Sequence, residues 1–463
     1  MANAATMILA EKVASTGLAD APAEVRRVAR DIFFDTVSCI LAGTAEPGGA
    51  KMRRFVMKSG GGSGPASLLG TPYRAPAFLA ALANGTCAAI LDYDDNTWRL
   101  PGHPSGVIVP AVIALAEELD ASGEAALEAF MVGHETMAKL AAAVNAPALY
   151  VRGFHTTNTV GIFGVVAACA KLLKLDALRI ANAFGIAAAQ AGSLRPGMGT
   201  MTLGLHSGGG AADGLMSACL AADGFTGQPT IFEMRHGFVE AFLGNDSHAL
   251  DDICSDWCAP WDFVHPVEGA GIKLIPSATT SHCCGQIACE LHHTPGFDPH
   301  QIERIQWLAS PLGVTIARFA LPDSHYESLF CTPWAIAAGL VDGKLGIAQF
   351  SDERLKDSFT RELARKVQID VHPELRNTTN RALTTGGELT VWFKDGSVFK
   401  KTQWFPRAYP GGEPWTDEHL VSKYFECAAY AMSDEQARAA LPIIREVDRL
   451  ASIRELTECL RTQ

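Results

Sequence analysis

Apolar side chains recur at helical spacing through most of the first 265 residues. The segment 22–42 is the clearest example, because its apolar positions stand three or four residues apart: Val25, Val28, Ala29, Ile32, Phe33, Val37 and Ile40. Such spacing places the apolar side chains on one face of a helix. Comparable patterns predict helices at 7–19, 75–91, 106–119, 122–144, 160–173 and 211–223, with no convincing strand among them. We therefore predict an all-helical structure up to about residue 265.

The pattern changes after residue 265. Apolar and polar residues alternate, as in strands, at 304–309, 366–371, 388–393 and 397–402, and the last two flank the hairpin signal Lys394-Asp395-Gly396. Helical spacing appears at 277–292, 332–342 and 351–357, and returns after Pro410 at 416–431 and 433–461. We predict a mainly α fold with two parts. Residues 1–265 together with 410–463 form a large helical domain, and residues 266–409 form a smaller inserted α+β lid domain.

Composition narrows the function and the compartment. Hydrophobic residues make up 48% of the 463 residues and charged residues 19%, which indicates a large core or a broad oligomer interface. The net charge of −12 argues against a nucleic-acid partner, although a local cationic pocket can still bind an anionic substrate. The first residues lack the basic region of a secretory signal, and no apolar run is long enough to span a bilayer. With twelve cysteines and no signal, we expect a cytoplasmic protein with reduced thiols and no membrane association.

Three polar segments interrupt the apolar helices. The first, 91–106, carries Asp92, Asp94, Asp95, Thr97, Arg99, His103 and Ser105 between two apolar runs. The second, 153–159, places His155 beside Thr and Asn residues at a helix start, and the third, 195–210, contains Arg195 and His206. Buried polar groups need partners or a ligand, and free amides at a helix start suit a carboxylate. Plain helix capping by the Asp, Ser and Thr residues is the alternative, and the pattern leaves both open.

Several other chemistries lack their motifs. The turn Gly60–Gly64 is without the Gly-Lys-Ser/Thr of a phosphate-binding loop, and no Gly-x-Ser-x-Gly elbow of a serine hydrolase occurs. A zinc site would have to combine scattered Cys and His residues, but the paired Cys-x-x-Cys spacing of zinc sites is absent. We predict no metal and interpret these cysteines as buried, inert thiols: Cys254, Cys258, Cys283, Cys284 and Cys289.

Short motifs in a fixed order run through nearly the whole chain. In this order they resemble the family of 2-methylcitrate dehydratase (the MmgE/PrpD family), which has cis-aconitate decarboxylase and iminodisuccinate epimerase as relatives. The motifs are Asp92-Tyr-Asp-Asp95, Gly102-His-Pro-Ser105, Gly153-Phe-His155, Gly199-Thr-Met-Thr202 with Leu205-His206, Gly224-Phe-Thr-Gly227, Lys273 with Pro276 and His282, Pro333-Trp-Ala-Ile-Ala337, and Lys423-Tyr-Phe425.

The resemblance implies a pocket between the helical and lid domains, a homodimer, and neither a metal nor an organic cofactor. It also implies a small di- or tricarboxylate substrate that undergoes elimination, decarboxylation or epimerisation. Each of these reactions moves a proton at a carbon beside a carboxylate, a task for imidazoles. We therefore assign His103 and His155 as the acid/base pair and Asp92 as the carboxylate that orients one imidazole.

Further residues are candidates for substrate binding. Thr97 and Ser105 offer hydroxyl groups, and Lys273 and His282 stand at the start of the lid domain. His206 is the next histidine, and Arg195 is a second cation that would meet negative charge together with Lys273. Two positions depart from the family, because Leu203 stands where a Lys is usual and Trp334 where a pocket Tyr is expected.

Three explanations of these departures stay open: a substrate with fewer charges, compensation by Arg195, or lost activity. Accordingly, three hypotheses remain. The first is a dehydratase-like lyase. The second is an epimerase, favoured by the spacing of Asp92 and His103. The third is a repurposed or inactive member.

Overall fold

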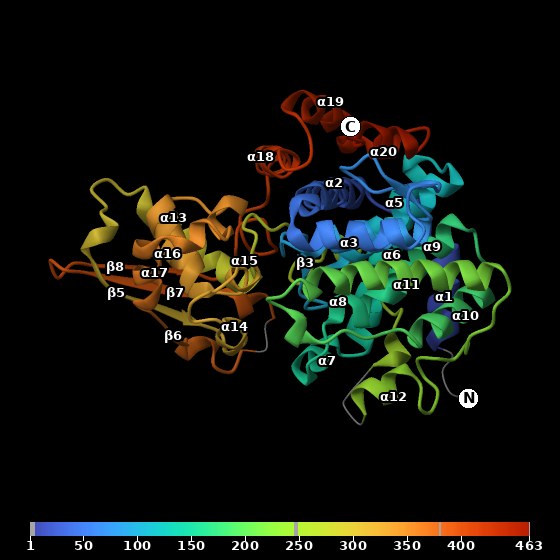
Figure 1. Cartoon of the computed structure of the whole chain (residues 1–463). Helices are drawn as coiled ribbons and strands as arrows, with labels where there is room; N and C mark the ends of the chain where they lie inside the picture. The colour runs from blue at the N-terminus through green and yellow to red at the C-terminus, as the bar shows by residue number, and fades with distance from the viewer. Residues whose placement is uncertain (1–4, 245–248, 379–380, 463) are drawn as a thin grey trace.

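The computed structural model describes residues 5–244, 249–378 and 381–462. It is mainly helical, with 58% helix and a small mixed sheet, which confirms the predicted fold class (Figure 1). The first helices are α1 (Ala5–Ser15), α2 (Ala23–Ala45), α3 (Pro47–Lys58), α4 (Ala77–Ala89), α5 (Pro104–Leu119), α6 (Gly123–Ala143), α7 (Ala146–Arg152), α8 (Thr156–Thr159), α9 (Gly161–Leu172), α10 (Ala177–Ala188), α11 (Thr202–Ala222) and α12 (Phe238–Leu243). The later helices are α13 (His282–His292), α14 (Pro311–Ile316), α15 (His325–Ser328), α16 (Thr332–Asp342), α17 (Ser358–Arg365), α18 (Asp417–Ala428), α19 (Asp434–Arg445) and α20 (Arg454–Cys459).

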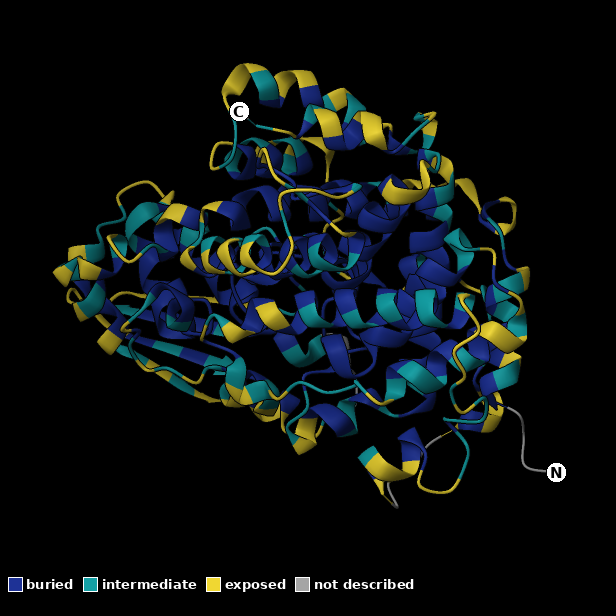
Figure 2. Cartoon of the chain, turned by 45° about the vertical axis from the view of Figure 1, so that its right-hand side comes forward, coloured by how far each residue is buried: buried dark blue, intermediate teal, exposed yellow. Residues whose placement is uncertain are grey.

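Helices α4, α5, α9 and α11 form the centre of the larger helical part. They are apolar around most of their circumference, and such helices pack inside a protein rather than on its surface. Figure 2 shows this central region as buried, with exposed residues confined to the periphery. No helix within the described residues combines the length and apolarity needed to cross a membrane.

The glycines of α11 allow close helix packing. A Cβ atom on Gly208 would stand 2.3 Å from Thr86 Oγ1 and 2.4 Å from the carbonyl oxygen of Leu82, both on α4. Glycine usually weakens a helix, and for this reason the sequence pattern placed the helix start at residue 211. That prediction is wrong, because α11 begins at Thr202, and four of its glycines face neighbouring helices: Gly204, Gly208, Gly210 and Gly214.

A four-stranded sheet lies at the left of Figure 1, on the side of the molecule opposite the large helical part. Its strands are β5 (Ile302–Ala309), β6 (Val367–Val371), β7 (Gly387–Phe393) and β8 (Val398–Gln403), in the order β6-β5-β7-β8. β5 and β6 are parallel, whereas β7 runs antiparallel to β5 and to β8. Apolar side chains of β5 and β7 share one core cluster with α13 and α16, which covers that face of the sheet. All four strands coincide with the predicted alternating segments.

The C-terminal helices return to the first helices of the chain. α18 packs against α2, where the Lys423 ammonium lies 2.7 Å from the Asp35 carboxylate. The predicted helix 433–461 is wrong as one element, because it is divided into α19 and α20. Between them the backbone bonds to the loop before α6: the N–H of Gly123 donates to Leu450 and that of Ile453 donates to Ala121. These bonds compete with continuation of the helix.

Other local predictions also fail. α3, α7 and α10 were not predicted, and the region thought to lack strands contains β1 (Ala66–Ser67), β2 (Arg74–Ala75) and β3 (Asn96–Thr97). Each of these strands has two residues, too few to create an alternating pattern. The helix predicted at 351–357 is wrong, because that range contains only the 3-10 turn Arg354–Lys356. The next helix, α17, begins at Ser358, where the Asp357 carboxylate caps it by accepting from the N–H of Thr360.

Candidate active site

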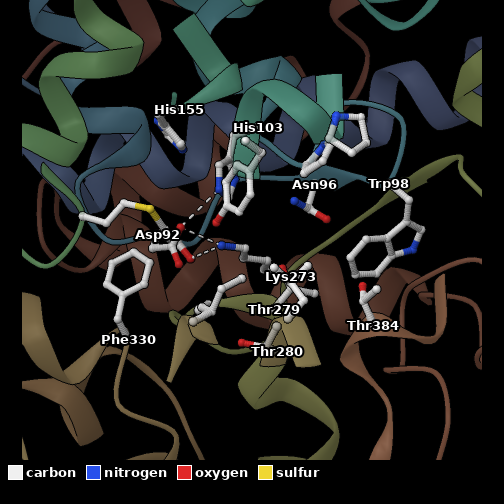
Figure 3. Close-up of a pocket in the computed structure, with 17 residues that line it drawn as sticks. Asp92, Asn96, Trp98, His103, His155, Lys273, Thr279, Thr280, Phe330 and Thr384 are labelled. Atoms are coloured by element: carbon white, nitrogen blue, oxygen red, sulfur yellow. Dashed lines mark hydrogen bonds and ion pairs between the residues drawn. The ribbon is translucent and has the colours of Figure 1, made fainter. Parts of the chain in front are cut away.

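A cavity of about 190 Å³ lies between the helical part and residues of the region that contains the sheet, from Lys273 to Thr384. This volume corresponds to roughly six water molecules at about 30 Å³ each, enough for a small organic acid. In Figure 3 the side chains of Asp92, Lys273 and His103 meet near its middle. The lining residues are Asp92, Asn96, Trp98, Pro101, His103, Pro147, Tyr150, His155, Met198, Lys273, Ala278, Thr279, Thr280, Leu312, Ile316, Phe330 and Thr384.

The loop between α4 and α5 carries the first site residues. Asp92 follows the end of α4 with a φ of 49°, in the left-handed region that Asp tolerates better than most residues. Further along, β3 pairs antiparallel with β4 (Ala270–Gly271), so that Asn96 faces Gly271. A Cβ atom on Gly271 would lie 2.3 Å from the Tyr409 ring, and this close approach requires glycine. The pairing brings Lys273, two residues later, beside Asp92.

An ionic cluster anchors the same loop from behind. The Arg99 guanidinium lies 2.8 Å from the Asp262 carboxylate and 3.3 Å from that of Glu268. Lys139, on α6, lies 2.9 Å from Asp262 and so joins the cluster to the helical core. Arg99 is absent from the cavity lining, and its role is to hold the loop.

His103 has its tautomer fixed by a backbone carbonyl. Its Nδ1 lies 2.8 Å from the carbonyl oxygen of Asp95, which can only accept a hydrogen bond, so Nδ1 carries the proton. Nε2 therefore presents its lone pair, 3.3 Å from Asp92 Oδ1. The expectation that Asp92 sets the tautomer is thus corrected: the carboxylate stands at the opposite nitrogen, where it would stabilise a protonated ring.

Asp92 and Lys273 form a buried ion pair. The ammonium lies 2.8 Å from Asp92 Oδ1 and donates to the Asp92 carbonyl oxygen at 2.8 Å, which ties it to both the side chain and the backbone. Burial raises the pKa of Asp92, and the Lys273 charge opposes that rise. Asp92 Oδ2 has no hydrogen-bond partner among the described residues, so one oxygen of the pair stays available.

His155 belongs to a chain of hydrogen bonds that begins at His103. The backbone N–H of His103 donates to Thr157 Oγ1 at 3.0 Å, so the Thr157 hydroxyl proton is free to be donated to His155 Nε2, 3.3 Å away. His155 Nδ1 then carries a proton and donates to His206 Nδ1 at 2.9 Å. The rings of His103 and His155 are 6.2 Å apart, centroid to centroid.

Burial favours the neutral form of these three histidines, His103, His155 and His206. Burial lowers the pKa of His103 well below its usual value, and the Lys273 charge lowers it further. Burial also lowers the pKa of His155, with added repulsion from His206, and it lowers the pKa of His206 to about 4. A neutral imidazole has a lone pair for proton abstraction near pH 7.

Two further carboxyl groups lie behind His103. Ser105 donates to Asp95 Oδ1 through its backbone N–H, at 3.0 Å, and through its hydroxyl, at 2.5 Å; burial nevertheless raises the pKa of Asp95 to about 7. Burial raises the pKa of Asp94 well above its usual value. Asp92, Asp94 and His103 offer potential metal-ligand atoms within 4.8 Å of one another. The Lys273 ammonium already contacts this group and supplies a positive charge there.

Three predicted substrate ligands make structural contacts away from the cavity lining. The Thr97 hydroxyl donates to the carbonyl of Glu268 at 2.6 Å, and Ser105 is occupied by Asp95. His282 Nε2 lies 3.2 Å from the carbonyl of Ser277, and burial lowers its pKa to about 3. Neither hydroxyl caps a helix, because Thr97 lies on β3 and Ser105 lies inside the first turn of α5, while His282 packs at the start of α13.

The two family departures and Arg195 also lie outside the lining. Trp334 is fully buried, and its indole N–H donates to the carbonyl of Gln349. Leu203 packs in a cluster with Met198 and Phe330, directly behind the cavity wall. The Arg195 guanidinium lies 4.0 Å from the centre of the Tyr150 ring and donates to the Tyr150 carbonyl. Arg195 thus supports a wall residue.

Sequence reasoning missed most of the apolar lining. Tyr150 stands on α7, a helix that was not predicted, and Met198 and Phe330 resemble ordinary core residues in the sequence. Thr279 and Thr280 follow Lys273 in a polar run, the one signal that could have pointed to them.

Comparison with known protein families shows to which family this chain belongs. The MmgE/PrpD N-terminal domain matches residues 7–251, and the MmgE/PrpD C-terminal domain matches residues 276–449. The chain belongs to the MmgE/PrpD family. The family inferred from the ordered motifs is therefore confirmed.

Curated relatives of this MmgE/PrpD chain include several cis-aconitate decarboxylases. That of Mus musculus is 27% identical over 400 residues, spanning 84% of this chain and 79% of the relative. That of Homo sapiens is 27% identical over 398 residues, with 84% and 80% covered. That of Aspergillus terreus is 24% identical over 474 residues, with 95% and 92% covered.

Proposed function

We propose that this MmgE/PrpD protein is a lyase that removes water or carbon dioxide from a small carboxylic acid by histidine acid/base chemistry. The observation that carries the proposal is the position of the His103 Nε2 lone pair. It stands 3.3 Å from Asp92, beside the Lys273 ammonium, on a cavity of small-molecule size. The decarboxylase relatives supply the class of reaction.

In the dehydratase reaction, His103 Nε2 takes a proton from the carbon beside the substrate carboxylate. The imidazolium that forms keeps its Nδ1–H bond to the Asp95 carbonyl and gains attraction from Asp92. The electrons of the broken C–H bond develop negative charge on the carboxylate, and the Lys273 ammonium stabilises that charge. In a decarboxylation the C–C bond to the departing carbon dioxide leaves its electron pair on carbon, and His103, having first taken up a proton from solvent, would give that proton to the same carbon.

His155 supplies the second proton transfer in this proposal. Its ring lines the same cavity, and it is connected to Thr157 and His206. In this step His155 acts as an imidazolium: its Nε2 takes up a proton from solvent before the chemistry and gives it to the substrate hydroxyl, which leaves as water while the new double bond forms, and His155 returns to its neutral Nδ1–H form. His206, outside the lining, accepts the Nδ1–H hydrogen bond of His155 and so stabilises that imidazolium.

The remaining expectations about architecture also enter as proposals. Residues 266–409 contribute Lys273, Ala278, Phe330 and other lining residues of the cavity. Residues 92–198 contribute the acid/base groups. We propose that the first set acts as the predicted lid, which moves to admit substrate and excludes water on closure. The predicted homodimer stands as a further proposal.

Incubation with candidate hydroxy acids and unsaturated acids tests the reaction. A dehydration produces an alkene conjugated with the carboxylate, seen as new ultraviolet absorbance, and a decarboxylation releases carbon dioxide. Neither signal with any acid, together with no solvent deuterium uptake, would contradict the proposal.

An epimerase is the second candidate. The observation that favours it is the presence of two imidazoles, 6.2 Å apart, on one cavity, because inversion at a carbon uses one base and one acid. An epimerase would introduce one solvent deuterium at the carbon beside the carboxylate with no net elimination. Mass spectrometry in deuterium oxide separates the two reactions.

A further inference from the structure

The charge content of the cavity is low. Among the described residues that line it, Asp92 and Lys273 are the full charges, and they neutralise each other at 2.8 Å. His103 and His155 add no charge because burial lowers the pKa of each imidazole. A substrate with two or three carboxylates would therefore meet one cation that is already paired.

The two arginines near the cavity, Arg195 and Arg318, lie outside the lining and make contacts with other protein groups. Arg195 bonds to the Tyr150 carbonyl and lies over the Tyr150 ring, and Arg318 donates to the Arg195 carbonyl. Leu203 holds an apolar side chain behind Met198 and Phe330, at the position where the family resemblance expects a Lys. A buried carboxylate without a cation loses its hydration and receives no compensation.

Apolar groups cover much of the cavity wall. Trp98, Tyr150 and Phe330 contribute aromatic rings, and further aliphatic surface comes from Pro101, Pro147, Met198, Ala278, Leu312 and Ile316. Such a wall stabilises the hydrocarbon part of a ligand by removing its surface from water. Thr279, Thr280 and Asn96 are the neutral polar members of the lining, suited to a hydroxyl or a carbonyl rather than to an anion.

We infer that the substrate is a monocarboxylic acid with an apolar remainder, in contrast to citrate-like acids. Its single carboxylate lies at Lys273, and its hydrocarbon part lies against Met198 and Phe330. This inference rests on the proposed function for the reaction, but the ligand class follows from the cavity alone. For a dehydration, His103 removes a proton from C2, the hydroxyl on C3 leaves as water with a proton from His155, and the C2–H electron pair becomes the C2=C3 bond.

Binding of unreactive acids tests the ligand class separately from the chemistry. Butanoate and succinate differ only in a methyl group replaced by a carboxylate, so calorimetric titration of the wild-type protein with each isolates the second charge. We expect butanoate to bind about 10–100-fold more tightly, the range in which an apolar pocket discriminates. Equal or tighter binding of succinate overturns the inference, whatever the reaction is.

Turnover of matched 3-hydroxy acids tests the class during reaction. Malate is 3-hydroxybutanoate with its methyl group replaced by a carboxylate, and 3-hydroxyhexanoate extends the apolar part. We expect kcat/KM to rise from malate to 3-hydroxybutanoate to 3-hydroxyhexanoate. If no acid is dehydrated but butanoate still binds better than succinate, the proposed reaction fails and the ligand class stands. A preference for malate over 3-hydroxybutanoate overturns the class.

A positive charge introduced behind the apolar cavity wall gives a further test of the preference for monocarboxylates. L203K puts an ammonium behind Met198 and should bring succinate affinity to that of butanoate or above. L205K is the matched control, since Leu205 is on the same helix with 43% of its surface exposed. The control should keep the wild-type preference. Should L203K fold, as judged by circular dichroism, and leave the preference unchanged, Leu203 has no part in selection and the inference is overturned.

Discussion

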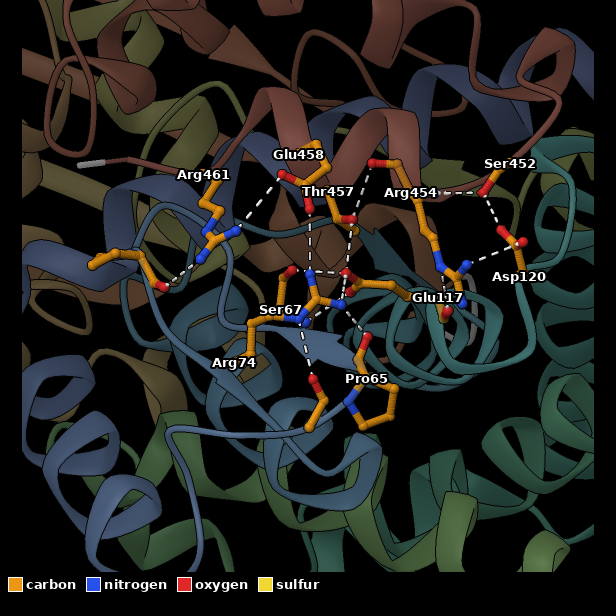
Figure 4. A network of polar contacts seen from close by, with 12 residues as sticks. Pro65, Ser67, Arg74, Glu117, Asp120, Ser452, Arg454, Thr457, Glu458 and Arg461 are labelled. Carbon is orange, nitrogen blue, oxygen red and sulfur yellow. Dashed lines mark hydrogen bonds and ion pairs between the residues drawn. The ribbon is translucent and has the colours of Figure 1, made fainter.

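The molecule buries carboxylates in two different ways. Glu117, inside α5, is completely paired: its oxygens accept from the Ser67 N–H at 2.7 Å, the Ser67 hydroxyl at 2.8 Å and the Thr457 hydroxyl at 2.9 Å, and Arg74 lies 2.9 Å away (Figure 4). Asp92 has one oxygen paired with Lys273, and its second oxygen has no hydrogen-bond partner within the described structure. Both side chains are almost inaccessible to solvent.

The difference separates a structural role from a chemical one. The Glu117 network joins three segments that are distant in the sequence, the β1–β2 hairpin, α5 and the C-terminal helix α20, and it borders no described cavity. Asp92 and its neighbours border a cavity and retain unused hydrogen-bonding capacity, a costly arrangement that proteins keep at functional sites. Satisfied polar groups rigidify a fold, whereas the unsatisfied ones at the cavity await a ligand.

Removal of the proposed base should produce the largest effect. H103Q keeps a polar side chain of similar size but removes the imidazole, and we expect kcat to fall by about 10²–10⁴-fold, the usual contribution of a general base. Thermal unfolding should change little. Steady-state kinetics with the best acid of the panel measures the effect, and H300Q, at an exposed histidine, is the matched control. Retention of more than a tenth of kcat by H103Q would assign the proton transfer to another group.

Loss of Glu117 should act on stability and spare the chemistry. E117A leaves Arg74 and the hydroxyls of Ser67 and Thr457 without their acceptor, and breaking such a buried pair costs about 3 kcal/mol of unfolding free energy. Urea titration measures that loss, while kcat/KM of the folded fraction should stay within about twofold of wild type. E118A, at the exposed neighbour, should leave both unchanged. A large drop in kcat for E117A without destabilisation would contradict the structural role of Glu117 and its separation from the cavity group around Asp92.

The pH profile should show the lowered pKa of the cavity histidines. The base works as neutral imidazole, so activity is lost as pH falls through its folded-state pKa, which burial places below the ordinary value near 6.5. We expect kcat/KM to remain level from pH 8 to pH 6.5 and to decline with a midpoint below pH 6.5. Circular dichroism over the same range controls for unfolding. A midpoint at or above pH 6.5 would indicate a solvated base.

The sequence predicts the helical frame well because apolar periodicity is a local property. α2, α5 and α9 each carry a continuous apolar pattern, and all are found. α11 was predicted too short, since the helix-breaking tendency of its glycines is overridden by close contact with α4. The break between α19 and α20 depends on bonds to the loop before α6, which no local pattern reveals.

The site was predicted in part, for a related reason. Asp92, His103, His155 and Lys273 are chemically distinctive, and the structure brings them to one cavity. Thr97 and Ser105 share the same polar segment, but their hydroxyl groups bond to Glu268 and to Asp95 instead. Side-chain direction within a loop depends on its tertiary pairing. The apolar walls were missed because an apolar residue facing a cavity looks like one facing the core.

Asp94 allows the comparison to be tested with nearly isosteric changes. Its carboxyl group is buried, neither oxygen has a hydrogen-bond partner among the described side chains, and burial raises its pKa well above the usual value, which favours the neutral, protonated form. D94N therefore replaces one neutral group by another, and we expect the unfolding free energy to change by less than about 1 kcal/mol and kcat to change less than about threefold. E117Q makes the same replacement where the carboxylate is paired with Arg74, and we expect about 1–3 kcal/mol of destabilisation. If D94N instead lowers kcat by two orders of magnitude, Asp94 is ionised during the reaction, and the carboxylate that serves His103 is Asp94 rather than Asp92.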